Sequence, residues 1–282
     1  MSTPILKLGL GIGWRAEIAL TIERRTDLGF VEIVAEHFSP DRELPQSLIN
    51  LRERGLAIVP HGLSLSLGGA ERIDPRRVDA LAKLATRVGA PFVSEHVAFV
   101  RSGDLEAGHL LPIPRTRAAI DIVVENVREA QKHLPVPLAL ENISTLVQWP
   151  GAEMDEATFV REILERTDCL MLFDVANFWA NAKNFGKDAV GELSALPLER
   201  LAYVHVGGGV ERDGIYHDTH AAATPQGVLE LLESLCTIAA PPGVMLERDD
   251  DYPPPRQLNE ELDAIAAAVS RGTSQRTAHV GG

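Results

Sequence analysis

The sequence predicts a single (β/α)8 barrel, or TIM barrel, of the α/β class. Short apolar runs rich in β-branched residues alternate with longer segments of helical periodicity, eight of each, between residues 6 and 270. The length of 282 residues is close to that of one such barrel. Most of the apolar runs also end on an acid or a histidine, and the carboxyl ends of the strands are where barrel enzymes carry their chemistry.

The strands and helices are expected to alternate along the whole chain. The expected strands cover residues 6–13, 30–36, 56–62, 91–96, 136–142, 169–175, 201–206 and 243–249. The expected helices cover residues 16–28, 43–55, 74–89, 116–134, 155–167, 189–196, 225–239 and 258–270. Longer loops are expected at residues 101–114, 177–188 and 207–220. The apolar runs suit strands that are buried on both faces, as in a parallel sheet.

Particular residues mark where several helices should begin or end. Asp74 and Pro75 are expected as the N-cap and the first residue of the third helix. Gly29 and Gly55 are expected to close the first and second helices as C-caps, because glycine adopts the left-handed conformation at low cost.

The chain is expected to form one domain. Residues 1–271 would be the barrel, and the small and polar residues 272–282 would form a flexible tail. The alternative fold is a doubly wound open sheet. It would need a glycine-rich first crossover, which GLGIGW matches only loosely, and no suitably placed ribose-binding acid follows.

Composition excludes several classes of partner. The net charge of -13, with no cluster of Lys or Arg to offset it, is unlike that of a nucleic-acid-binding protein. The start MSTPILKLGLGIGW lacks the pattern of a signal peptide, and the chain has no run of about 18 apolar residues that would span a membrane. Cys169 and Cys236 are expected to be buried and reduced. The chain is therefore expected to be cytoplasmic.

Candidate metal ligands stand at the ends of six expected strands. They are His61, then Glu95 and His96, then Glu141 and Asn142, then Asp174 and Asn177, then His205, and finally Glu247. In a barrel these groups converge at one end, which is costly unless a cation neutralises the carboxylates. Carboxylate and imidazole ligands suit Zn²⁺, Mn²⁺ and Fe²⁺, and the scarcity of cysteine argues against an iron–sulfur cluster.

The loop after the seventh strand adds the compact sequence Asp218-Thr219-His220. Because Asp218 and His220 are two residues apart, an extended loop would point both side chains the same way, and Glu247 and Asp249 have the same spacing. Without a cation, carboxylates crowded in one cavity repel one another, so we expect them to have raised pKa values and to destabilise the fold near neutral pH.

Two further features lie at strand ends. The pair Glu36 and His37 follows the second strand and would either support the metal ligands or contact the substrate. The three glycines 207–209 follow the seventh strand. They would form either a phosphate cradle, as loops after late barrel strands do, or a tight turn that requires positive φ.

A resemblance to a known family rests on phrases spread from about residue 9 to residue 261. These are FVEIVAEHF, HGLSLSLGG, VSEH, LLPIPRT, LALENIS, LFDVANFWANAKNFG, AYVHVGGG, HDTH and MLERDDDYP, in this order. The chain resembles the multinuclear non-heme iron-dependent oxidative enzymes, which include the oxidase of methanobactin biosynthesis. The resemblance implies a TIM barrel with two or three iron ions, mixed Fe²⁺ and Fe³⁺. It also implies O2-dependent modification of cysteine in a ribosomally made precursor peptide, which a small partner protein presents.

The resemblance also implies which residues hold the metal. The implied ligands are His61, His96, Glu141, Asp174, Asn177, His205, Asp218, His220 and Glu247. The implied catalytic residues are His61, His96, Glu141, Asp174, His205 and Glu247. No residues are assigned to any other cofactor.

The chain departs from the family pattern at two positions. Many members have a histidine where this chain has Phe185, and another where it has Gly209. A cluster without these two imidazoles would hold fewer irons or fill the positions with water, so two and three metals both stay open.

The sequence therefore predicts an iron- and O2-dependent oxidoreductase that acts on peptidyl cysteine. The alternative is a divalent-metal barrel that isomerises a sugar or hydrolyses a phosphodiester, because these enzymes share the strand-end pattern of Glu, Asp and His. A third class is a metal-dependent binding protein without turnover. The identity of the bound metal would separate the three.

Overall fold

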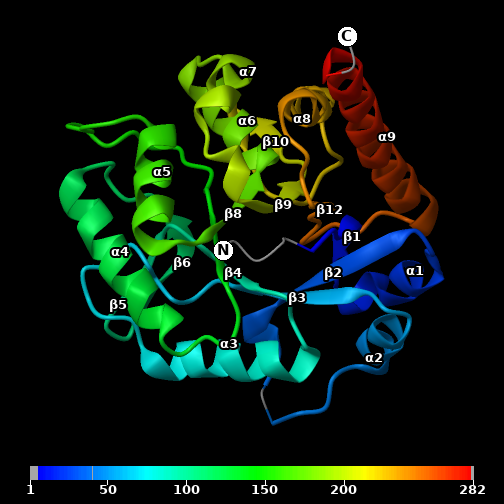
Figure 1. Cartoon of the computed structure of the whole chain (residues 1–282), viewed down its shortest axis with the longest axis horizontal. Coiled ribbons are helices and arrows are strands. Elements are labelled where there is room, and N and C mark those ends of the chain that lie inside the picture. Colours follow the sequence, from blue (N-terminus) through cyan, green and yellow to red (C-terminus); the bar gives the residue numbers. More distant parts are fainter. Residues whose placement is uncertain (1–5, 40, 281–282) are drawn as a thin grey trace.

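In the computed structural model, which describes residues 6–39 and 41–280, eight parallel strands close into a barrel. The strand order around the barrel is β1-β12-β9-β8-β7-β4-β3-β2, and helices surround the strands (Figure 1). The predicted (β/α)8 barrel is therefore confirmed.

The bounds of the elements follow from hydrogen bonding along the chain. The barrel strands are β1 (Gly9–Gly13), β2 (Leu28–Val34), β3 (Ala57–Gly62), β4 (Val93–His96), β7 (Leu138–Glu141), β8 (Leu170–Asp174), β9 (Leu201–Val206) and β12 (Gly243–Leu246). The α-helices are α1 (Ala19–Arg24), α2 (Gln46–Glu53), α3 (Pro75–Val88), α4 (Arg117–Gln131), α5 (Glu156–Thr167), α6 (Val175–Phe185), α7 (Ala189–Glu192), α8 (Gln226–Ile238) and α9 (Pro255–Val280). Short 3₁₀ helices cover Ala16–Ile18, Ala35–His37, Leu193–Ala195 and Leu198–Arg200.

The inside of the barrel has two levels, because alternate residues of a strand point inward. The lower level is an apolar cluster that includes Phe30, Val59, Phe92, Ala139, Leu172, Tyr203 and Met245. Two residues further along the chain from each of these stands a buried polar side chain; these are Glu32, His61, Ser94, Glu141, Asp174, His205 and Glu247. The apolar level closes the barrel beneath the polar one, so the polar level faces the carboxyl ends of the strands.

The register between strands brings the polar residues to a common height. His96 lies opposite Glu141 where β4 pairs with β7, and Asp174 lies opposite His205 where β8 pairs with β9. Residues far apart in the sequence are thus adjacent because the sheet aligns them.

The first helix is shorter than predicted. It ends at Arg24, and Gly29 lies inside β2 instead of closing a helix. The sheet explains this glycine, because a Cβ at Gly29 would stand 1.8 Å from the carbonyl oxygen of Leu8. The predicted C-cap at Gly29 is therefore wrong. The predicted N-cap is confirmed, since Asp74 accepts a hydrogen bond from the backbone N–H of Arg76 with Pro75 at the start of α3.

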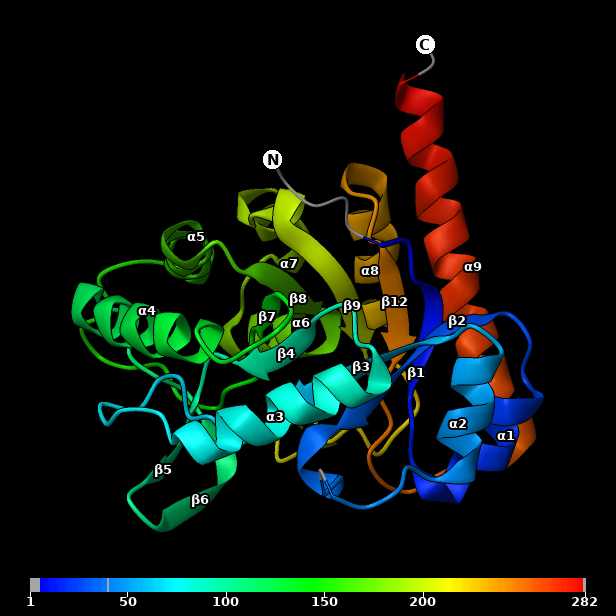
Figure 2. The same cartoon turned by 60° about the horizontal axis from the view of Figure 1, so that its bottom comes forward.

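Two of the predicted loops contain antiparallel hairpins. Residues 101–114 include most of the hairpin of β5 (Phe99–Ser102) and β6 (Leu105–Leu111). Residues 207–220 include the hairpin of β10 (Val210–Arg212) and β11 (Ile215–His217). In Figure 2 the β5–β6 hairpin extends at the bottom, and α9 extends to the opposite side of the barrel.

The predicted loop at residues 177–188 is mostly helix α6, which follows β8 without a break. Asp174 caps this helix by accepting a hydrogen bond from the N–H of Asn177, and Gly186 closes it with φ of 65°. Asp is a preferred N-cap residue and Gly a preferred C-cap residue. The helix was not predicted because the asparagines between the two caps are more typical of a loop.

The last helix is longer than predicted. It runs over Pro255–Val280, through residues 272–280, where a flexible tail is expected, and residues 281–282 lie outside the described residues. Of the helices in the described part of the chain, none combines the length and apolar character needed to cross a membrane.

Candidate metal centre

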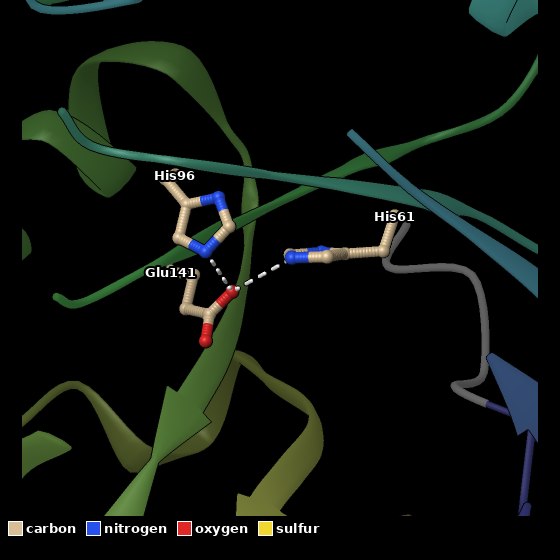
Figure 3. A group of neighbouring side chains, drawn as sticks. All are labelled: His61, His96 and Glu141. Atoms are coloured by element: carbon tan, nitrogen blue, oxygen red, sulfur yellow. Dashed lines mark ion pairs between the residues drawn. The ribbon is translucent and has the colours of Figure 1, made fainter. Parts of the chain in front are cut away.

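Glu141, the last residue of β7, stands in the middle of the polar level. Its Oε2 atom lies 3.1 Å from Nε2 of His96 and 3.4 Å from Nε2 of His61, as the dashed lines of Figure 3 show. All three side chains are buried. The other ring nitrogen of His96, Nδ1, lies 3.3 Å from the carbonyl oxygen of Gly62. A proton shared there leaves Nε2 of His96 free to bind a cation.

The second oxygen of Glu141 belongs to another group of ligand atoms. Its Oε1 lies 3.2 Å from Nδ1 of His205, and the same nitrogen lies 2.8 Å from Oε2 of Glu247. Asp174 offers an oxygen within 4.8 Å of the other ligand atoms of this group. Glu141 therefore belongs to two groups of possible metal ligands and offers one oxygen atom to each of them.

The loop after β11 brings a third group together. Nε2 of His220 lies 2.7 Å from Oδ2 of Asp218 and 3.6 Å from Oδ2 of Asp174. The two loop side chains meet as expected, but the loop is not extended, because His220 has a φ of 49°. The N–H of Asp249 donates to the carbonyl oxygen of His220 at 2.9 Å and holds this uncommon conformation.

Asn177 lies beside these groups, on the first turn of α6. Its Nδ2 donates to Oδ2 of Asp174 at 2.9 Å and to the carbonyl oxygen of Asn142 at 3.1 Å. The structure thus places Asn177 where it orients Asp174 toward His220.

A fourth group lies at the rim. His220, Glu247 and Asp249 offer ligand atoms within 4.8 Å of one another. Asp249 also forms an ion pair with Arg15, whose guanidinium is buried and donates to the carbonyl oxygen of Trp14 at 2.9 Å. Arg15 has no counterpart in the predicted site, because a single arginine after a strand is no signal in one sequence.

The donor atoms of these groups fit a cluster of cations. In the described residues, buried side-chain atoms without a hydrogen-bond partner include His61 Nε2, Glu141 Oε2, His205 Nδ1, Asp218 Oδ1, His220 Nε2 and Glu247 Oε2. Buried polar atoms are almost always hydrogen-bonded in proteins. Six unpartnered atoms that converge, all nitrogen or oxygen, are the donor set of divalent first-row metals.

Histidines in the cluster attract protons when no cation is bound. Burial opposes the charge on His205, but the carboxylates of Glu32, Glu247 and Glu141 outweigh burial and raise the pKa of His205 well above 6.5. The pKa of His96 and that of His220 are raised in the same way, against burial, by their carboxylate neighbours. A metal ion would have to displace these protons.

The carboxylates do not all behave as expected. Burial and the charge of Asp218 raise the pKa of Asp174 well above 3.8, in line with the expected mutual repulsion. Burial also acts to raise the pKa of Glu141 and that of Glu247, but the surrounding histidines outweigh it and keep both below 4.5. The expectation of a raised pKa is wrong for Glu141 and Glu247, because the histidines take up the protons instead.

The chain departs from the family pattern at Gly209 and Phe185, and the structure shows what surrounds each of them. A Cβ at Gly209 would stand 2.0 Å from the carbonyl oxygen of His217, so a histidine there would require a different β10–β11 hairpin. Phe185 ends α6 and lines a small pocket with Arg115 and Glu156.

The glycines 207–209 do not form the turn of positive φ that was one of the two expectations for them. None of the three is among the described residues with positive φ. A Cβ at Gly208 would stand 2.2 Å from the carbonyl oxygen of Ala223, and one at Gly207 would stand 2.8 Å from Cδ2 of His220. These glycines are needed because other parts of the backbone and His220 approach them closely.

Glu32 was missing from the predicted site. It is buried in β2, and its Oε2 accepts hydrogen bonds from Nε2 of His205 at 2.7 Å and from the hydroxyl of Tyr203 at 2.5 Å. The sequence signal that could have identified Glu32 is an acid at an inward position of an otherwise apolar strand. The predicted pair behaves differently: Glu36 accepts the N–H of Leu63 at 2.9 Å, and His37 lines a cavity.

Two cavities reach the cluster from the surface. The larger, of about 640 Å³, is lined by Trp14, Phe38 and Tyr252 and reaches His61 and Glu247. The other, of about 430 Å³, lies beside the β5–β6 hairpin and reaches His96, Asp218 and His220. Leu63 and Asp249 line both cavities, so both open onto the same cluster.

The two cysteines lie outside the cluster. Both Cys169 and Cys236 are free and buried, as predicted. Burial raises the pKa of Cys169 to about 12 and that of Cys236 to about 11, so neither is a thiolate at neutral pH.

Comparison with protein families gives a match over most of the chain. Residues 9–270 match the model of a family described as "RiPP precursor modification enzyme MbnB/TglH/ChrH". RiPPs are ribosomally made peptides that enzymes modify after synthesis.

Similar proteins occur in several bacteria, each under the name UPF0276 protein. The chain is 52% identical to one from Streptomyces avermitilis over 94% of its own length, but it spans only 55% of that relative. It is 36% identical to one from Bordetella bronchiseptica, covering 95% of each chain. It is 34% identical to one from Chromobacterium violaceum, covering 98% of this chain and 100% of the relative.

Solved structures with the same fold have low sequence identity. A xylose isomerase domain protein from Alicyclobacillus acidocaldarius aligns with a TM-score of 0.58 and 16% identity, covering 95% of this chain and 99% of that one. Endonuclease IV from Thermus thermophilus aligns with a TM-score of 0.59 and 20% identity, covering 93% and 99%. At this identity the likeness shows the barrel fold alone.

Proposed function

Because the chain belongs to the MbnB/TglH/ChrH family of RiPP precursor modification enzymes, we propose that it is an iron- and O2-dependent oxidase of peptidyl cysteine. The observation that carries the proposal is the double contact of Glu141. Its two oxygens face two different groups of buried ligand atoms. A carboxylate in this position supports a cluster of more than one ion, and the resemblance to the family adds the proposal of two or three irons, mixed Fe²⁺ and Fe³⁺.

Iron is the cation that the donor set and the family together favour. The proposed ligands are the nine predicted residues, from His61 on β3 to Glu247 after β12. They offer nitrogen and oxygen atoms without thiolate, as non-heme iron sites do. Iron bound there would supply the oxidation of a substrate thiol at the expense of O2.

The residues around the cluster would hold the substrate and the ligands in place. The aromatic side chains Trp14, Phe38 and Tyr252 line the larger cavity and would pack against residues that flank the substrate cysteine. Arg15 holds Asp249, and the backbone of Asp249 holds His220. The apolar level closes the barrel beneath the cluster, and the two cavities would give the reacting group access to it.

The proposed substrate is a cysteine-containing precursor peptide. Membership of a family of RiPP precursor modification enzymes supports a precursor peptide as the substrate, and the cysteine is part of the proposal. A small partner protein that presents the peptide, and O2 as the oxidant, belong to the same proposal. The alternative, a metal-dependent sugar isomerase or phosphodiesterase, has the fold in common but no specific observation in its favour.

Mass spectrometry of a peptide substrate tests the proposal. The iron-loaded protein is mixed with a cysteine-containing precursor encoded beside its gene, together with any small partner protein encoded there. We expect a change of peptide mass that requires iron, O2 and the cysteine, since the thiol is the group that the cluster would oxidise. The matched control is the same peptide with Cys→Ser. An unchanged peptide, together with turnover of a sugar or a phosphodiester with Mn²⁺ or Zn²⁺, would instead establish the alternative.

A further inference from the structure

A continuous line of hydrogen bonds runs across the barrel beneath the candidate ligands. Nδ1 of His61 lies 2.8 Å from Oγ of Ser94, and this Oγ lies 2.7 Å from the hydroxyl oxygen of Tyr203. The Tyr203 hydroxyl donates to Oε2 of Glu32 at 2.5 Å, and Nε2 of His205 lies 2.7 Å from the same oxygen. Each of the five residues has at most 1% of its surface exposed. Two candidate metal ligands are thus joined through three residues that lie outside the ligand set.

The direction of every hydrogen bond in this line follows from the number of protons available. Tyr203 has one hydroxyl proton and gives it to Glu32, so Tyr203 can only accept from Ser94. The single hydroxyl proton of Ser94 is then used, so Ser94 can only accept from Nδ1–H of His61. At the other end, the Glu32 oxygen that accepts the Tyr203 proton also faces Nε2 of His205, so this nitrogen supplies the proton of their hydrogen bond.

We infer that Glu32, Tyr203 and Ser94 are positioning residues that fix His61 and His205 in opposite tautomers. The inference rests on the proposed metal centre. With a cation bound, His61 would carry its proton on Nδ1, which frees Nε2 toward Glu141. His205 would keep its proton on Nε2, which frees Nδ1 toward Glu141 and Glu247. One carboxylate, Glu32, orients both rings from below, directly for His205 and through Tyr203 and Ser94 for His61, as carboxylates that accept the N–H of metal-binding histidines do.

Packing alone does not explain the carboxylate of Glu32 or the hydroxyl of Tyr203. A buried carboxylate is costly unless it is paired, and Oε1 of Glu32 has no hydrogen-bond partner among the described residues. The ring of Tyr203 packs on Phe30 and Phe92, with centroid distances of 5.8 Å and 5.4 Å, so the ring fills the apolar level without its hydroxyl. Phenylalanine in place of Tyr203 would keep this packing and remove only the hydrogen bonds.

The test uses zinc alone as a diamagnetic probe and reads the ring nitrogens of ¹⁵N-labelled histidine by NMR. In the zinc-loaded wild type we expect His61 as the Nδ1–H tautomer and His205 as the Nε2–H tautomer. In Tyr203→Phe the Ser94 hydroxyl loses its acceptor and can donate to Nδ1 of His61, so the His61 signals should change while those of His205 stay. In Glu32→Gln the His205 signals should change.

Metal affinity gives a second readout that does not depend on activity. Competition with a chelator should show zinc and ferrous iron bound about 10–100-fold more weakly in Tyr203→Phe and Glu32→Gln, as for other residues that orient histidine ligands. The matched control is Tyr216→Phe, which removes another buried tyrosine hydroxyl, bonded to the N–H of Gly209 at 2.5 Å. It should leave the signals of His61 and His205 unchanged.

Three results would separate this inference from the proposed function. If the wild type binds metal, but the variants keep its tautomers and its affinity, the positioning role is wrong and the metal centre stands. The same holds if the wild type shows the reverse tautomers. If the wild type binds neither zinc nor iron, the proposed metal centre fails and the inference fails with it.

Discussion

Glu141→Gln is expected to empty the metal centre and to lower oxidase activity by more than about 100-fold. Mutating a residue that only supports a metal ligand typically lowers metal affinity or activity about 10–100-fold. The effect at Glu141 should be larger, because Glu141 itself faces two groups of ligand atoms. Glutamine has the shape of glutamate but lacks its charge, and its amide nitrogen cannot bind a cation. The nearby His96 and His205 would also lose the carboxylate that their Nε2 and Nδ1 atoms face. Metal analysis and the peptide assay measure both effects.

The control for this substitution is Glu156→Gln. Glu156 is a half-buried carboxylate on α5, beside Arg115 and outside the four ligand groups found in the described residues. The Glu156→Gln substitution should leave metal content and activity near the wild-type values. Circular dichroism shows whether both variants keep the barrel. A folded Glu141→Gln protein with a full complement of metal would contradict the bridging role.

Metal is expected to stabilise the fold more at about pH 8 than at about pH 5.5. The raised pKa values of His96, His205 and His220 mean that their protonated forms stabilise the cation-free fold below pH 6.5. This stabilisation is lost as the pH rises through the folded-state values. A metal ion then replaces the protons. At a free metal concentration 1,000 times the Kd, binding adds about 4 kcal/mol to the free energy of unfolding.

The carboxylates set the lower limit of the pH range in which the cluster stabilises the cation-free fold. The lowered pKa values of Glu141 and Glu247 give stability above pH 4.5 that is lost as the pH falls through their folded-state values. Asp174, whose pKa is raised, destabilises the cation-free fold increasingly as the pH climbs above 3.8. The cluster of the chelated protein should therefore contribute most between pH 4.5 and 6.5.

Melting curves of chelated and iron-loaded protein at the two pH values test this dependence. For domains of this general size, each kcal/mol corresponds to about 2–4 °C in Tm. Glu141→Gln serves as the control and should show little shift with metal at either pH. Metal-induced shifts of equal size at both pH values would show that the histidine protons and the metal do not compete.

Much of the fold could be predicted because a parallel barrel leaves strong local signals. Its strands are buried on both faces, so they stand out as apolar runs, such as AIVPHG in β3. The elements that could not be predicted depend on tertiary contacts. Residue 29 is a glycine within a strand because the carbonyl oxygen of Leu8 leaves no room for a Cβ, and no local sequence pattern reveals that contact.

The candidate site was predictable to a similar degree. Strand-end residues such as His96 and Glu141 follow from the barrel geometry, and the structure groups them. The expected relationship to a family of peptide-modifying enzymes is confirmed at the level of the family. Arg15 gave no signal in the sequence. Glu32 gave one as an inward acid, but the roles of both residues depend on partners more than 150 residues away in the chain, Asp249 and Tyr203.

Counting the metals is the most direct test of the central claim, that this barrel holds a multinuclear iron centre. The protein is purified without oxygen, reconstituted with ferrous iron and freed of unbound metal before elemental analysis. We expect at least two irons per chain, because the described residues hold several groups of ligand atoms and Glu141 is shared between two of them. One iron or none per chain in the folded protein would contradict the account.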